Sequence, residues 1–140
     1  MAAQSSGEGR TVQVQVPATS ANLGPGFDTL GLALSVYDEL TITALSGDRL
    51  EIEVSGSGAS EIARDESNLV VRSIEHVYND VGREMPGLRI EARNGVPHGR
   101  GLGSSGAAVT AGVLAAKGLL AGEVEFSDAD LLRLATELEG

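Results

Sequence analysis

The chain has 140 residues, of which 41% are hydrophobic and 21% charged, with a formal net charge of −10 and no cysteine. This composition is typical of one globular domain, and it excludes a disordered chain, a disulfide scaffold and a thiolate metal site. The acidic balance, without a Lys and Arg cluster, argues against a nucleic-acid partner, although backbone N–H groups can still bind one nucleotide. The N-terminus lacks the basic and apolar regions of a secretory signal, so a cytoplasmic protein is expected.

Four segments of alternating apolar and polar residues predict β-strands with one buried face each. These strands are expected at residues 11–16, 32–44, 50–54 and 88–92. The second is either one long strand or two collinear strands, interrupted near Tyr37–Glu39. The small polar residues 1–10 are expected to form a mobile tail before the first strand.

Three segments with apolar residues at helical spacing predict α-helices. The first runs from an N-cap at Ser67 to a stop at Gly82, and the third begins after Ser127. The second is nearly all apolar, ends near Ala121 and is too short to span a membrane, so a buried core helix is expected. Strands followed by helices favour an α+β fold in one domain, residues 11–140. Because the chain stops in or just after a helix, we expect a fragment that lacks a C-terminal domain.

A glycine-rich segment, Gly99–Ser105, lies between the last predicted strand and the second predicted helix. Glycines let a backbone wrap closely around a ligand, and the unpaired N–H groups and dipole of the helix start favour a phosphate. The hydroxyl groups of Ser104 and Ser105 can bind a phosphate or a metal ion. The alternative is a capped helix after a flexible turn. The segment is not a Walker A loop, since no Gly-Lys-Ser/Thr follows, and no acidic strand end completes a dinucleotide fingerprint.

Two long motifs resemble those of one enzyme family. Residues 96–107 read V-P-H-G-R-G-L-G-S-S-G-A and resemble the phosphate loop of the GHMP kinases. Residues 17–34 read P-A-T-S-A-N-L-G-P-G-F-D-T-L-G-L-A-L and are similar to the signature segment of the homoserine kinases within that family. The resemblance implies a GHMP-kinase N-terminal domain with a mixed sheet, a left-handed β-α-β unit and helices packed on the sheet. It also implies that the full-length enzyme uses ATP and Mg²⁺ to phosphorylate the hydroxyl group of L-homoserine in threonine biosynthesis.

The resemblance assigns roles to residues at matching positions. Asn22 matches an asparagine near the reacting hydroxyl group, and Asp28 matches a carboxylate that binds the substrate ammonium group. Asn68 resembles an asparagine of the adenine pocket, and Ser105 and Glu139 match the two Mg²⁺ ligands. The residues that match the triphosphate site are Pro97, His98, Gly99, Arg100, Gly101, Leu102, Gly103, Ser104, Ser105, Gly106 and Ala107.

Each assigned side chain also has a purely structural interpretation. Asn22 can cap a turn, whereas Asp28 and Asn68 can serve as N-caps of the segments that follow them. Glu137 is a competing candidate for the metal ligand, and both Glu137 and Glu139 can instead be solvated helix charges.

Two alternative functions stay open at this point. The chain could belong to another GHMP kinase that phosphorylates a different alcohol, or it could be a catalytically silent nucleotide-binding fragment. The 140 residues alone are expected to be inactive, because the family places part of its active-site wall in the C-terminal half. A homodimer of the full-length enzyme is a further expectation.

Overall fold

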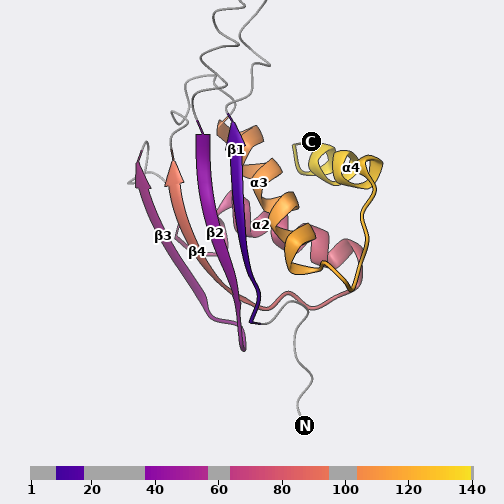
Figure 1. Cartoon of the computed structure of the whole chain (residues 1–140), viewed down its shortest axis with the longest axis horizontal. Coiled ribbons are helices and arrows are strands. Elements are labelled where there is room, and N and C mark those ends of the chain that lie inside the picture. Colours follow the sequence, from indigo (N-terminus) through magenta and orange to yellow (C-terminus); the bar gives the residue numbers. More distant parts are fainter. Residues whose placement is uncertain (1–8, 18–36, 57–63, 95–103, 140) are drawn as a thin grey trace, which may run out of the picture.

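A computed structural model describes residues 9–17, 37–56, 64–94 and 104–139, and these form a four-stranded sheet with three helices on one face (Figure 1). The strands are β1 (Thr11–Pro17), β2 (Tyr37–Leu45), β3 (Leu50–Gly56) and β4 (Gly87–Asn94). The helices are α2 (Leu69–Asp80), α3 (Ser104–Leu119) and α4 (Asp128–Glu139). The predicted α+β class is confirmed. No helix within the described ranges is long and apolar enough to cross a membrane.

The sheet is mixed, with the strand order β1-β2-β4-β3. β2 is antiparallel to both β1 and β4, whereas β3 and β4 are parallel neighbours joined through α2. These two strands and their connecting helix form a β-α-β unit. Direct cross-strand neighbours place one row of β-branched side chains across all four strands, namely Val12, Ile42, Ile90 and Ile52.

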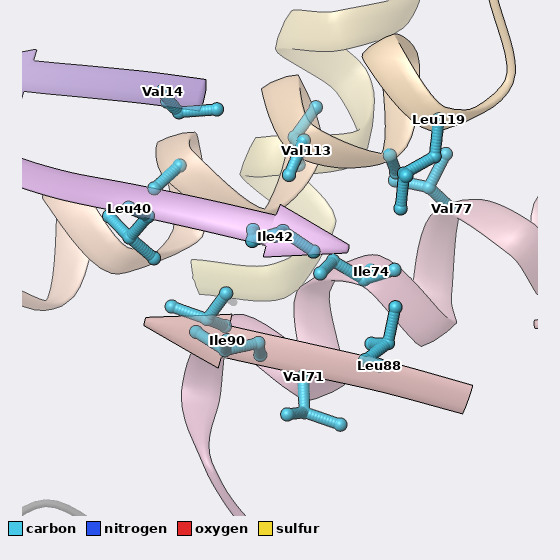
Figure 2. Packing of buried hydrophobic residues seen from close by; sticks show 14 of the residues in the cluster. Val14, Leu40, Ile42, Val71, Ile74, Val77, Leu88, Ile90, Val113 and Leu119 are labelled. Carbon is cyan, nitrogen blue, oxygen red and sulfur yellow. The ribbon is translucent and has the colours of Figure 1, made fainter. Parts of the chain in front are cut away.

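The hydrophobic core lies between the sheet and the helices (Figure 2). Ile42 and Ile90 project from the sheet toward Ile74 of α2, and none of the three is more than 2% exposed. α3 packs against the sheet, α2 and α4, so apolar residues are needed on most of its surface. The prediction of a buried core helix is thus confirmed by its buried residues, which include Val109, Ala111, Val113, Ala115, Ala116 and Leu119.

Two details differ from the predicted elements. β2 is continuous from Tyr37, so the predicted interruption at residues 37–39 is wrong; the reason is that β1 pairs with this segment residue by residue, up to Tyr37 itself. The N-cap of α2 is Asn68, not Ser67, because the Ser67 hydroxyl instead donates to the Asp65 carboxylate at 2.5 Å. Residues 32–36 of the predicted strand lie outside the described residues.

Backbone conformation and backbone hydrogen bonds define where two other predicted segments begin or end. Gly82 has a φ of 69°, a left-handed conformation that ends α2 where the sequence predicted a stop. Gly9 and Arg10, which were assigned to the tail, are part of the fold: the Gly9 N–H donates to the Ala44 carbonyl at 2.9 Å. Residues 1–8 lie outside the described ranges.

Candidate active site

The backbone of Ser104–Ala107 forms the first turn of α3, which begins with the last two residues of the glycine-rich segment. This turn holds no acidic residue, so the positive end of the helix dipole is not offset by the helix's own side chains. At the opposite end, the Arg10 guanidinium donates at 3.3, 3.1 and 2.6 Å to the carbonyls of Gly118, Leu119 and Ala121. The C-terminal end of α3 is therefore bonded to the residue that precedes β1, and the start of α3 offers N–H groups that lack intrahelical partners.

α2 and α3 run in the same direction and are in close contact. A Cβ atom at Gly112 of α3 would lie 2.4 Å from the Ser73 Cβ and 2.9 Å from the Val70 carbonyl oxygen, both in α2. Beyond the C-terminal ends of the two helices, Arg83 and Glu123 form an ion pair at 3.0 Å. These contacts show that the start of α3 and the start of α2 lie toward the same end of the helical layer.

Asn68 occupies this end of the layer as the N-cap of α2. Its side-chain oxygen accepts hydrogen bonds from the N–H groups of Val70 and Val71 at 2.8 and 3.4 Å, and the residue is 8% exposed. The capping interpretation is thus confirmed. The predicted adenine contact stays a prediction, and the position of Asn68 at the end of the helical layer toward which α3 begins is compatible with it.

α4 runs antiparallel to α2. Its Arg133 binds Asp80 at 3.0 Å, and one turn later its Glu137 binds His76, one turn earlier in α2, at 2.8 Å. The last turn of α4 therefore points toward the end of the layer at which α2 and α3 begin (Figure 1).

This direction is the one that a metal site formed by Ser105 and Glu139 requires. Only the backbone of these two residues is described, so their pairing stays a prediction. The carboxylate of Glu137, the competing candidate, is already bonded to His76 and to Arg133, which favours Glu139 as the ligand. Asn22, Asp28 and the loop residues 97–103 lie outside the described residues.

Acid is expected to weaken the attachment of α4 to α2. Hydrogen bonding from Arg133 holds the pKa of Asp80 below its usual 3.8, and the bonds to His76 and then Arg133 hold the pKa of Glu137 below its usual 4.5. Because both folded-state pKa values lie below the unfolded ones, the stabilisation is present above the unfolded values and is lost as the pH falls through the folded values. Below about pH 4.5, the melting temperature should fall more steeply for the full-length protein than for an Arg133→Met variant. Equal slopes would contradict this expectation.

A shallow depression lies on the outer face of the sheet, opposite the helices. Its lining includes Glu39, Glu53, Glu91 and Arg93. Three carboxylates repel a triphosphate, and the described ranges contain no group of three or more His, Cys, Asp or Glu side chains placed to hold a metal. We therefore assign the candidate site to the helix starts.

Two contacts that orient the helices of the candidate site were not predicted from the sequence. They are the approach of Gly112 to Ser73 and the ion pair of Asp80 with Arg133. The signal for the first was Gly112, a glycine inside a mostly apolar helix, which often marks a close helix–helix contact. The second had no sequence signal, because the two residues are 53 positions apart.

Comparison with known proteins identifies the family of this domain. Residues 68–140 match the family described as GHMP kinases N terminal domain. The chain is 60% identical over 132 residues to the homoserine kinase of Clavibacter michiganensis subsp. michiganensis and 50% identical over 130 residues to that of Streptomyces coelicolor. These matches cover 94% and 92% of this chain but only 42% of each relative. The crystal structure of homoserine kinase from Cytophaga hutchinsonii matches with a TM-score of 0.70 and 32% identity, over 92% of this chain and 41% of that one. The chain belongs to the GHMP kinase family.

Proposed function

We propose that this chain is the nucleotide-binding part of a homoserine kinase, which transfers the γ-phosphoryl group of ATP to the hydroxyl group of L-homoserine in threonine biosynthesis. The observation that carries the choice of acceptor is the 60% identity to a homoserine kinase over 94% of this chain, an extent that includes both motif segments. The start of α3, with no acidic residue in its first turn, supports the binding of a phosphate there.

The proposed mechanism depends on positioning and on charge, which supply most of the catalysis in phosphoryl transfer. The backbone of residues 97–107 would hold the triphosphate. Asn22 would orient the acceptor hydroxyl group, and Asp28 would bind the substrate ammonium group. A carboxylate paired with a cation is a poor proton acceptor, so we do not assign Asp28 as a general base.

Mg²⁺ would be held by the Ser105 hydroxyl and the Glu139 carboxylate together with phosphate oxygens. Mg²⁺ prefers oxygen ligands, and one or two from the protein suffice when phosphates supply others. The direction of α4, whose last turn points toward the end of the layer where α3 begins, supports this pair. When bound, the ion offsets the negative charge of the phosphates.

The proposal also covers the cellular location, the partners and the oligomeric state of the enzyme. We assign it to the cytoplasm, with ATP and the amino acid as partners and with no nucleic-acid or membrane partner. We also infer that the full-length enzyme is a homodimer, which light scattering on the purified protein can test.

A comparison of acceptors tests the proposed substrate. The full-length protein should be assayed for ADP release with ATP, Mg²⁺ and, in parallel, homoserine, mevalonate or galactose. We expect kcat/KM to be highest for homoserine by at least about tenfold, since sites that pair with a charged substrate group discriminate strongly against analogues that lack it. A preference for another alcohol would identify a different GHMP kinase, and release with none of them would contradict homoserine as the acceptor.

Substitutions of Asn68 separate its capping role from a nucleotide contact. Asn68→Ala should destabilise the domain by about 1 kcal/mol, because the first N–H groups of α2 lose their side-chain acceptor. Asn68→Ser retains a capping oxygen and should leave stability nearly unchanged. If Asn68 also contacts adenine, both variants should bind ATP more weakly than the wild type, as measured by titration calorimetry. An unaltered ATP affinity in Asn68→Ser would leave Asn68 as a helix cap alone.

A further inference from the structure

Four side chains join α2 to α4 in two adjacent polar interactions. Arg133 donates from both terminal nitrogens to the two carboxylate oxygens of Asp80, at 3.1 and 3.0 Å. Glu137 lies 2.8 Å from the His76 ring nitrogen and 3.3 Å from the Arg133 guanidinium. The members are four residues apart in each helix, so the set spans one turn of both. We call His76, Asp80, Arg133 and Glu137 the α2–α4 clamp.

The clamp contributes more to the orientation of α4 than to the free energy of folding. The apolar attachment of α4 is Leu134, which is fully buried, with partly buried leucine and alanine side chains around it. The clamp side chains are between 30% and 46% exposed, and exposed ion pairs contribute little to the free energy of folding. A bidentate arginine–carboxylate pair, however, fixes both the distance and the relative orientation of its two partners.

Such a constraint matters at the end of α4. A helix that has one fully buried side chain and otherwise only partly buried ones can still rotate about its axis, and each rotation moves the side chains of its last turn sideways. The clamp holds the flank of α4 at two points one turn apart, which opposes both rotation and sliding along α2. Its last member, Glu137, is two residues before Glu139.

We propose that the α2–α4 clamp is a positioning device for the metal site, which fixes the rotation and register of α4 so that the Glu139 carboxylate is held where Mg²⁺ binds. Asp80 and Arg133 are its principal positioning residues. This inference rests on the proposed function, which assigns Mg²⁺ to Ser105 and Glu139.

A second ion pair offers a matched control. Arg83 and Glu123 lie 3.0 Å apart and are 39% and 34% exposed, close to the values of the clamp. They join the segment after α2 to the segment after α3 and include no residue of α4. Breaking this pair removes a comparable surface interaction from the same layer and leaves the α2–α4 clamp intact.

The experiment measures how strongly Mg²⁺ enhances nucleotide binding. In the full-length protein, the affinity for a fluorescent ATP analogue is determined in excess EDTA and again in saturating Mg²⁺, for the wild type, Arg133→Met, Asp80→Asn and Arg83→Met. Asp80→Asn keeps the shape of the side chain, so it preserves the test if Arg133→Met does not fold. Arg133→Lys keeps the positive charge but cannot donate the two parallel hydrogen bonds of the guanidinium group, so it serves as the conservative variant.

We expect Arg133→Met and Asp80→Asn to reduce the Mg²⁺ enhancement by roughly threefold to tenfold while the affinity in EDTA stays unchanged. Arg133→Lys should give an intermediate loss, and Arg83→Met should behave as the wild type. Equal enhancement in all variants, or an equal loss in Arg83→Met, would overturn the clamp proposal.

The same measurement distinguishes this inference from the function on which it rests. A wild type that shows no enhancement by Mg²⁺ would overturn the metal assignment and the clamp together. A wild type that shows the enhancement but does not phosphorylate homoserine would overturn only the proposed acceptor. The clamp proposal would still be tested by the ratio of the affinity for the ATP analogue in Mg²⁺ to that in EDTA.

Discussion

Gly112→Val is expected to lower the free energy of unfolding of this domain by about 3 kcal/mol, the upper range for overpacking a core. Even the first added carbon would lie 2.4 Å from the Ser73 Cβ and 2.9 Å from the Val70 carbonyl oxygen. Neither atom can rotate away, because one is the root of a side chain and the other belongs to the backbone of α2. The two helices must therefore separate, which also shifts the start of α3 relative to the N-cap of α2.

Urea denaturation of the full-length protein, followed by circular dichroism, measures this loss. Gly112→Ala should lie between the wild type and Gly112→Val, because a gain of about 1 kcal/mol in helix propensity offsets part of the clash. Gly118→Ala in the same helix is the control: its new carbon would lie 2.8 and 2.9 Å from the two methyl groups of Val12, which belong to a side chain and not to a helix backbone. If Gly112→Ala proved as stable as Gly118→Ala, the close contact between α2 and α3 would be wrong.

Asp28→Asn should raise the KM for homoserine by about tenfold to a hundredfold in the full-length protein. In the proposed function, Asp28 offsets the positive charge of the substrate's ammonium group. A hydrogen bond between charged groups contributes roughly 1.5–3 kcal/mol, and each 1.4 kcal/mol corresponds to a factor of ten in affinity. Steady-state kinetics at saturating ATP and Mg²⁺ measure the change, and the KM for ATP should stay close to the wild-type value.

Asn22→Ala provides the contrast to Asp28→Asn. Because Asn22 is assigned to the reacting hydroxyl group rather than to a substrate charge, this substitution should mainly lower kcat. An unchanged KM for homoserine in Asp28→Asn would show that the ammonium group is bound elsewhere. Comparable losses in kcat and KM for both variants would mean that the two residues do not have separate roles.

Much of the fold was predictable because strands and helices leave different periodic patterns. The alternation of Val12, Val14 and Val16 is enough to predict a strand with one buried face, and the structure buries Val14 and Val16. Gly82 was predictable as a helix stop because glycine readily adopts the left-handed conformation observed there. Patterns of this kind depend on residues that are close together along the chain.

Features that depend on distant residues were not predictable in this way. The alternation in each strand shows which face is buried, but it does not show that β4 lies between β2 and β3. Ser67 and Asn68 are both good N-cap residues, and the choice depends on Asp65, which accepts a hydrogen bond from the Ser67 hydroxyl.

The candidate site also has local features that were predictable from the sequence and long-range features that were not. The glycine-rich segment and the helix after it could be recognised from the sequence, since both are local. The common direction of α2 and α3 and the reversed direction of α4 follow from contacts such as Gly112 with Ser73 and Arg133 with Asp80. Helical periodicity identifies the buried face of each helix, but it does not identify the helix against which that face packs.

The central claim of the proposed function is that the two motif segments, residues 17–34 and 96–107, form one site in which ATP and homoserine meet. Hydrogen exchange of the full-length protein, measured by mass spectrometry with and without each ligand, tests it most directly. We predict that ATP with Mg²⁺ slows exchange in residues 97–107 and in the first turn of α3. Homoserine, added to the ATP-bound protein, should slow exchange in residues 17–34, whereas galactose should not. Protection of neither segment, or protection by ATP confined to other parts of the chain, would contradict the claim.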